Sequence, residues 1–189
     1  MILSAGLHDA SAYHQAIVAA AQRHDMRIVG PDCLAIMAPH ALINATFART
    51  SVLPGNLGPN SQSGALNTAV LDWAQSRQVG FSGIISAGDM TDAKLGDLID
   101  VLATDPHTHA ILLNADCLTE AAEFMVAARA AVLHKPIIAI NAGKSQLAAR
   151  ATLSHTWQRS LKDYHLDDRA AMEANLLVDS RTSSLRFHR

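Results

Sequence analysis

Hydrophobic residues in this chain fall into short, nearly continuous runs, separated by longer segments in which they recur every three or four positions. Short unbroken runs are typical of strands buried on both faces of a parallel sheet, and the longer segments are typical of amphipathic helices. Their alternation predicts an α/β fold with a parallel sheet built from βαβ units. The candidate strands are Ile2–Leu3, Met26–Val29, Gly80–Ser86, Ala110–Leu113, Pro136–Ile140 and Leu176–Val178.

Three segments between these runs have helical spacing: Asp9–His24, a segment around Leu66–Trp73, and one that begins near Thr119. Thr119, followed by Glu120 and Glu123, has the composition of a capped helix start, because acidic residues there complement the helix dipole. The apolar faces comprise Tyr13, Ile17, Ala20 and Ala21 in the first segment, Leu66, Val70 and Trp73 in the second, and Phe124, Ala127, Ala128 and Ala131 in the third.

A domain boundary is predicted between Phe47 and Asn60, where glycine and proline crowd together and helical periodicity is lost. Residues 1–55 then contain only a strand, a helix and a strand, too little sheet for a doubly wound fold by itself. We therefore expect residues 1–55 to be the back half of one domain, and residues 56–189 to form a second.

Composition excludes several classes of protein. The chain has 189 residues, 49% of them hydrophobic and 17% charged, which is typical of a packed globular protein. With a net charge of −2 and no run of Lys or Arg, nucleic acid is not expected as a partner. No apolar run approaches the roughly 20 residues that span a membrane. Cys33 and Cys117 form no disulfide or zinc spacing, so we expect a cytoplasmic protein with reduced thiols.

The segment Asn60–Leu66 brings two serine hydroxyls and a glycine to the point where a loop turns into a helix. Free backbone N–H groups and the helix dipole at such a point favour a phosphate, and Gly64 would let it come close. From the motif alone, the plainer interpretation as an ordinary serine N-cap is favoured.

Two further residues could take part in phosphate chemistry. His155, within Ser154–Thr156, has a nucleophilic ring nitrogen that could accept a phosphoryl group beside a helix start. Asp116 follows the Ala110–Leu113 run, where parallel sheets place ligand-contacting groups, although a solvated loop aspartate is the simpler interpretation. The pair His107 and His109 is a weak metal pattern without a third ligand, and we set it aside.

Taken together, these segments resemble one family in order and spacing. The most specific stretches are Ser61–Ala65, Leu71–Ala74, Gly80–Ser82 and Ala128–Pro136, with Gly30–Cys33 before them. The chain is similar over about residues 1–155 to the NDP-forming acyl-CoA synthetases, relatives of the succinyl-CoA synthetase α subunit. It also resembles the N-terminal half of bacterial protein lysine acetyltransferases of the Pat type.

The resemblance implies that residues 56–189 form a succinyl-CoA-synthetase-like flavodoxin domain. Residues 1–55 would be the C-terminal part of a CoA-binding Rossmann domain. It implies no metal. The site residues it implies are Ser61, Gln62, Ser63 and Gly64 for phosphate, His155 as the transient phosphoryl carrier supported by Asp116, and Gly30, Pro31 and Cys33 for CoA.

The implied cofactor is CoA or acyl-CoA. ATP or ADP would bind on an ATP-grasp domain or subunit, for which this chain has no room, so such a partner is expected. Self-association into a homo-oligomer is left open.

Three departures from the family pattern carry expectations. Asp32 stands where the family has Asn, and its charge should repel a phosphate. Asp116 replaces a Glu and is one methylene shorter. Leu57–Asn60 occupies the place of the first flavodoxin strand, where Gly58 and Pro59 should weaken the sheet.

Three hypotheses follow. The chain is an acid–thiol ligase module that needs a partner to be active, a non-catalytic module that senses acyl-CoA or serves as a scaffold, or an inactive truncated remnant. A remnant should unfold with poor cooperativity.

Overall fold

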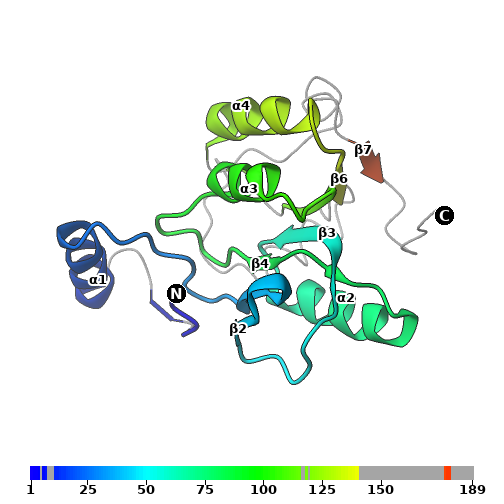
Figure 1. Cartoon of the computed structure of the whole chain (residues 1–189). Helices are drawn as coiled ribbons and strands as arrows, with labels where there is room; N and C mark the ends of the chain where they lie inside the picture. The colour runs from blue at the N-terminus through cyan, green and yellow to red at the C-terminus, as the bar shows by residue number, and fades with distance from the viewer. Residues whose placement is uncertain (5, 8–10, 116–117, 119, 141–176, 180–189) are drawn as a thin grey trace, which may run out of the picture.

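The computed structural model describes the chain except for residues 5, 8–10, 116–117, 119, 141–176 and 180–189 (Figure 1). The helices are α1 (Ala12–Arg23), α2 (Gly64–Arg77), α3 (Leu95–Thr104) and α4 (Ala121–Val132), with a 3-10 turn η1 at Pro39–Ala41. The strands are β1 (Ala35–Ala38), β2 (Ile43–Thr46), β3 (Pro54–Ser61), β4 (Ile84–Ser86), β5 (Ala110–Asn114), β6 (Ile137–Ile140) and β7 (Leu177–Asp179).

The seven strands of the described residues belong to one sheet, in the order β2-β1-β4-β3-β5-β6-β7. From β4 to β7 the neighbouring strands are parallel, whereas β1 is antiparallel to both β2 and β4. The predicted α/β fold with a parallel sheet is therefore confirmed, and an antiparallel hairpin extends one edge.

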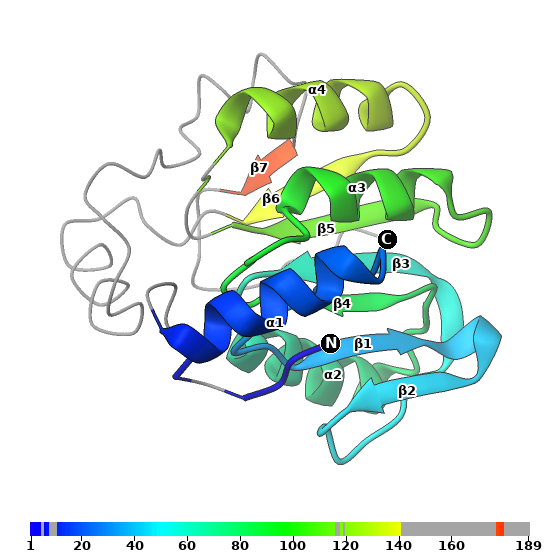
Figure 2. The ribbon, with the colours of Figure 1, turned by 90° about the vertical axis from the view of Figure 1, so that its left-hand side faces the viewer.

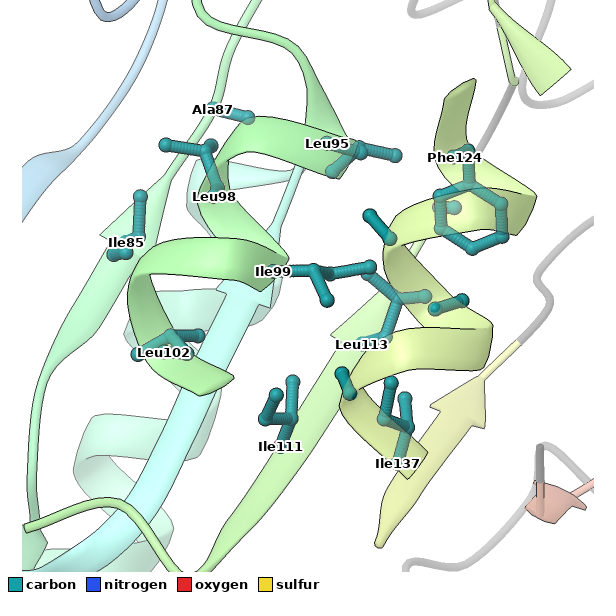
Figure 3. Packing of buried hydrophobic residues seen from close by; sticks show 14 of the residues in the cluster. Ile85, Ala87, Leu95, Leu98, Ile99, Leu102, Ile111, Leu113, Phe124 and Ile137 are labelled. Carbon is teal, nitrogen blue, oxygen red and sulfur yellow. The ribbon is translucent and has the colours of Figure 1, made fainter. Parts of the chain in front are cut away.

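Helices cover both faces of the sheet, with α2 on one side and α3 and α4 on the other (Figures 1 and 2). The larger hydrophobic cluster lies under α3 and α4 (Figure 3) and includes Ile85, Ile99, Ile111, Leu113 and Phe124. The smaller cluster, on the α2 side, comprises Leu34, Met37, Leu71, Ala74, Phe81 and Ile84.

The expectation that Leu57–Asn60 weakens the sheet is wrong, because these residues lie within β3, between β4 and β5. The carbonyls of Leu57 and Ser61 both accept hydrogen bonds from the β4 side, at Ser82 and Ala87. Pro59 lies between them and therefore faces the same side. Since the β4 ladder begins only at Asn60, the N–H that Pro59 lacks removes no ladder bond.

Close packing requires one glycine of β3 and favours another. A Cβ on Gly55 would overlap the backbone of Gly80, whereas one on Gly58 would lie 2.9 Å from a Leu102 methyl carbon, which would have to shift. The glycines that predicted a boundary here instead mark places where neighbouring chain segments pack closely against a strand.

The predicted strands Ile2–Leu3 and Met26–Val29 do not form. One backbone hydrogen bond, from Ile2 N–H to the Val29 carbonyl at 3.0 Å, joins the two segments, and Leu3 and Met26 are exposed. Strand structure occurs instead in the β1–β2 hairpin, where we predicted none. This hairpin lies within residues 1–55 and pairs with β4; the division of the chain at residue 55 stays a prediction.

The predicted helices form. The buried residues of α4 are Phe124, Ala127, Ala128 and Ala131, as predicted, whereas the buried faces of α1 and α2 differ from expectation. In α2 the buried residues are Asn67, Leu71 and Ala74, one position beyond the predicted stripe. Tyr13 of α1 is exposed. Helix α3 was not predicted. Helix α4 begins after Glu120, which makes no side-chain capping bond, and Thr119 lies outside the described residues.

No described helix has the length and apolar character needed to cross a membrane.

Candidate active site

The candidate site lies where β3 and β4 end. Ser61 and Ser86 are the last residues of these strands and are partners in the parallel register. The Ala87 N–H donates to the Ser61 carbonyl at 2.8 Å, so pairing continues just past both strands. Loops that follow the carboxyl ends of parallel strands are where open α/β sheets bind ligands. Figure 2 shows β3, β4 and β5 side by side with α2 behind them.

The start of α2 has free hydrogen-bond donors. Ser63 is the N-cap, and its Oγ accepts from the Leu66 N–H at 3.2 Å. Within the described part of the chain, the N–H groups of Gly64 and Ala65 have no acceptor, and neither does the Ser63 hydroxyl hydrogen. Three donors at the positive end of a helix dipole can together hold an anion.

Ser61 differs from Ser63 because its hydroxyl is fully engaged. Its Oγ accepts from the Ser63 N–H at 3.0 Å and from Asn114 Nδ2 at 3.2 Å, and it donates to the Ser63 carbonyl at 3.1 Å. The Ser61 hydroxyl therefore shapes the loop and has no hydrogen left to donate to a ligand.

Gln62 is anchored on both its backbone and its side chain. Its N–H donates to the Asn114 carbonyl at 3.2 Å, and Nε2 donates to Met90 Sδ at 3.4 Å. The side chain is buried, so Gln62 connects the loop to β5 and to the β4–α3 loop.

The Gly30–Cys33 turn packs against the β4–α3 loop. The Asp89 N–H donates to the Pro31 carbonyl at 2.9 Å, and the Thr91 N–H donates to the Gly30 carbonyl at 3.2 Å. Gly88 has φ +60°, and a Cβ there would overlap the Pro31 carbonyl oxygen. Glycine is therefore required at position 88 by both its conformation and its contact.

Ser86 joins the two candidate segments. Its Oγ accepts from the Leu34 N–H at 2.9 Å, directly after the Gly30–Cys33 turn. A Cβ built on Gly64 would lie 3.5 Å from Leu34 N and 3.9 Å from Ser86 Oγ. The structure thus brings together Gly30–Cys33 and Ser61–Gly64, which are separated by about thirty residues in sequence. These distances also show that no described atom requires a glycine at position 64.

Cys33 is 3% exposed, and its Sγ donates to the Ile2 carbonyl at 3.3 Å. Burial raises the pKa of its thiol, which therefore stays protonated at neutral pH. Cys33 therefore stabilises the turn through its burial and its hydrogen bond to Ile2. Asp32, beside it, is exposed, has φ +52°, and donates its N–H to the Ser4 carbonyl.

His155 and Asp116 lie outside the described residues, and their roles stay predictions. In sequence, Asp116 follows Asn114 by two positions. No group of three or more His, Cys, Asp or Glu side chains in the described ranges is arranged to hold a metal ion. His107 does stack on His40, with ring centroids 4.0 Å apart.

Sequence reasoning missed three residues that organise this edge: Ser86, Gly88 and Asn114. Two of them carry the same signal, because Ser86 and Asn114 are polar residues at the carboxyl end of an apolar strand. Gly88 gave no signal of its own, because its role depends on the turn that packs against it.

Comparison with known proteins gives matches along most of the chain. Residues 54–185 match the model of the succinyl-CoA ligase like flavodoxin domain. The chain is 39% identical over 142 residues to the α subunit of ADP-forming acetate–CoA ligase I from Pyrococcus furiosus, covering 75% of this chain and 31% of that relative. It is 29% identical over 146 residues to an ADP-forming 4-hydroxybutyrate–CoA ligase from Nitrosopumilus maritimus, covering 75% of this chain and 21% of the relative.

Solved structures agree. The dinucleotide-forming acetyl-coenzyme A synthetase 1 of Ca. Korarchaeum cryptofilum, in complex with phosphate and ADP, superposes with a TM-score of 0.83 at 28% identity. The match covers 96% of this chain and 40% of that one, so the chain spans less than half the length of these relatives. The resemblance to lysine acetyltransferases stays a prediction. The chain belongs to the family of succinyl-CoA ligase like flavodoxin domains found in ADP-forming acyl-CoA ligases.

Proposed function

We propose that this chain is the CoA- and phosphate-binding module of an NDP-forming acyl-CoA synthetase, and that it becomes active with an ATP-grasp partner. The observation that carries the proposal is that Leu34, directly after the Gly30–Cys33 turn, lies beside both Ser86 and Gly64, and so brings the turn close to the Ser61–Gly64 loop. A CoA thioester and a phosphate must meet for an acyl phosphate to form, and these two segments are close enough to hold them.

The donors left free at the start of α2 suit a phosphate. The N–H groups of Gly64 and Ala65 and the hydroxyl of Ser63 would bind its oxygens, with the helix dipole adding attraction. Ser61 and Gln62 would hold the loop in shape.

The Gly30–Cys33 turn would hold the thioester end of CoA by its backbone and by Pro31, because the Cys33 thiol is buried and protonated. Phosphate attack on the acyl-CoA carbonyl then yields acyl phosphate and CoA. His155 would take the phosphoryl group from the acyl phosphate, releasing the carboxylate, and pass it to a nucleoside diphosphate on the partner. Asp116 would orient the imidazole.

The test is phosphoryl transfer to His155. The chain is mixed with an ATP-grasp subunit of an ADP-forming acyl-CoA ligase and ATP labelled at the γ-phosphate, and acid-labile, base-stable label is measured. Label on the wild type and none on His155→Asn is the expected result. The same subunit labelling its own α subunit is the positive control, and with that control working, an unlabelled wild-type chain rules out the catalytic proposal.

CoA binding separates this proposal from the non-catalytic alternative. If the chain binds CoA equally well as wild type and as His155→Asn but never accepts label, it is a ligand-binding module. The nucleotide is then irrelevant to its role.

A further inference from the structure

Helices α3 and α4 run side by side in Figures 1 and 2. They pack closely near their starts, where a Cβ on Gly96 would lie 3.5 Å from Phe124 Cα. A groove of about 390 Å³ lies over the same first turns of the two helices and is here called the α3–α4 groove. Its floor contains the buried side chains of Leu95, Leu118 and Phe124.

The rim of the α3–α4 groove is acidic. Four carboxylates line it, against a single ammonium group: Asp97, Asp100, Glu120 and Glu123 against Lys94. Val126, also on the rim, is 69% exposed, so apolar surface continues from the floor to solvent. An apolar floor with a charged rim of one sign is typical of a surface that binds an amphipathic segment of the opposite charge.

Part of this charge has a structural role within the chain. Asp97 accepts from the Lys94 N–H at 2.9 Å as part of a capping box, and it pairs with Arg27 at 2.9 Å. Glu120 lies 3.8 Å from the Lys94 ammonium. These contacts account for two of the four carboxylates.

Asp100 and Glu123 are the remaining two, and within the described residues neither has an ion pair. The helix dipole favours acidic groups in the first turn of a helix. Asp100 lies in the second turn of α3, so the dipole does not account for its charge. A hydrogen bond to Glu120, and the charge of Glu120, raise the pKa of Glu123. The charges of Glu120 and Glu123 repel each other, and a cation beside them would relieve that repulsion.

The extent of the groove indicates what fits. Its lining runs from Lys94 to Asp100 at the start of α3 and from Ala122 to Ala127 in α4, about 10 Å of each helix, which matches about two turns of a partner helix lying over both. We propose that the α3–α4 groove receives a basic amphipathic helix of a partner protein, with apolar side chains over Leu95 and Phe124 and Lys or Arg beside Asp100 and Glu123. This inference is independent of the proposed catalytic function.

The test uses three labelled synthetic peptides, each about four helical turns long, and fluorescence anisotropy with the full chain at near-physiological salt. One peptide is amphipathic with Leu on one face and Lys on the other, the second is a scramble of the same composition, and the third has Glu in place of Lys. We expect only the first to bind.

Paired variants place the binding on the groove. Asp100→Asn with Glu123→Gln should weaken the amphipathic Lys peptide by about tenfold or more. Asp25→Asn with Asp72→Asn, which removes two exposed charges elsewhere, should change its affinity less than about twofold.

Several outcomes would overturn the proposal. Equal binding of the scrambled peptide, or displacement by an equal concentration of spermidine, would mean that the rim is only an acidic patch. Unchanged affinity in the groove variant would place the peptide elsewhere. Failure of all three peptides to bind at millimolar concentration would show that the groove does not receive a basic amphipathic helix.

Discussion

Ser61 and Asn60 are neighbours in β3, and both are buried, but they differ in hydrogen bonding. The Ser61 hydroxyl, on the α2 side at the candidate site, makes three hydrogen bonds. The Asn60 side chain is 0% exposed, and neither its Nδ2 nor its Oδ1 has a partner among the described residues. By strand alternation it faces the α3 side, where its register partners Ile85 and Leu113 belong to the larger apolar cluster.

The difference separates two kinds of buried polar residue. Those at the carboxyl edge have partners: Asn114 donates to Ser61, and Ser86 accepts from the Leu34 N–H and so links the two loops. Asn60 holds nothing in the described chain, and a buried polar group without a partner costs about 1–3 kcal/mol. Polar groups therefore organise the site on one side of β3 and weaken the core on the other.

The largest effect is expected from Gly88→Ala, on the site side. The new Cβ would overlap the Pro31 carbonyl and force an unfavourable φ, so the unfolding free energy should fall by about 2–4 kcal/mol. Denaturant titration measures it. Gly6→Ala is the control, since Gly6 also has positive φ (+82°) but open space around it, and should cost about 1 kcal/mol. Equal losses in the two variants would show that the turn contact contributes nothing.

Ser86→Ala should cost about 1–3 kcal/mol, because it leaves the buried Leu34 N–H without its acceptor. Chemical denaturation with an unchanged m value would show the loss as a shift in midpoint. Ser76→Ala, which removes an exposed hydroxyl from α2, should change stability by less than about 0.5 kcal/mol. A Ser86→Ala variant as stable as the Ser76→Ala variant would contradict the joining role of Ser86.

Asn60→Val should have the opposite sign and raise the unfolding free energy by about 1–2 kcal/mol, because it replaces an unpaired polar group by a β-branched apolar one. Asn114→Val is the matched change in a neighbouring strand. It loses the bond to Ser61 and should lower stability by about 1 kcal/mol. Destabilisation by both would mean that Asn60 has a role that its contacts do not reveal.

The smallest effect concerns pH and the N-terminal segment. Burial alone raises the pKa of Asp92, but hydrogen bonds from the Ile28 N–H and the Arg27 guanidinium outweigh it and leave the pKa lowered. Its stabilisation is therefore present above the unfolded pKa of about 3.9 and is lost as the pH falls through the folded value. The effect is small because Arg27 is 61% exposed and solvent screens the pair.

Asp92→Asn should then lower stability at pH 7 and reduce its decline below about pH 4, as followed by thermal melts across that range. Exposed Asp72→Asn should leave the profile unchanged. An Asp92→Asn profile that matches the wild type at every pH would contradict the account.

Much of the fold could be predicted from periodicity. The apolar runs at Ala110–Leu113 and Pro136–Ile140 correspond to β5 and β6, because a strand buried on both faces is apolar throughout. Strand β3 could not be predicted this way. Gly55 is needed because the Gly80 backbone packs against it, and Pro59 is tolerated because the β3–β4 ladder begins only at Asn60. Both are facts of tertiary structure.

The candidate site divides similarly. Ser61–Gly64 and Gly30–Cys33 carry motifs, so both could be found in the sequence. That they lie close together depends on the β1–β2 hairpin, which brings Leu34 to Ser86, and no pattern predicted that hairpin. The engagement of Ser61 in three internal bonds could not be foreseen either, because all depend on where Asn114 and the Ser63 backbone lie.

The most direct test of the central claim, that these two segments form one ligand site, compares Ser63→Asp with Ser63→Asn. Both residues cap a helix as well as Ser, so α2 and the melting temperature without ligand should be preserved. Only Asp adds a negative charge where the phosphate would bind.

The measurement is the shift in melting temperature on adding excess acetyl-CoA with phosphate, since a ligand that binds only the folded chain raises it. We expect a rise of several degrees for the wild type and for Ser63→Asn, and little or none for Ser63→Asp. An equal rise in all three, or no rise in the wild type, would contradict the claim.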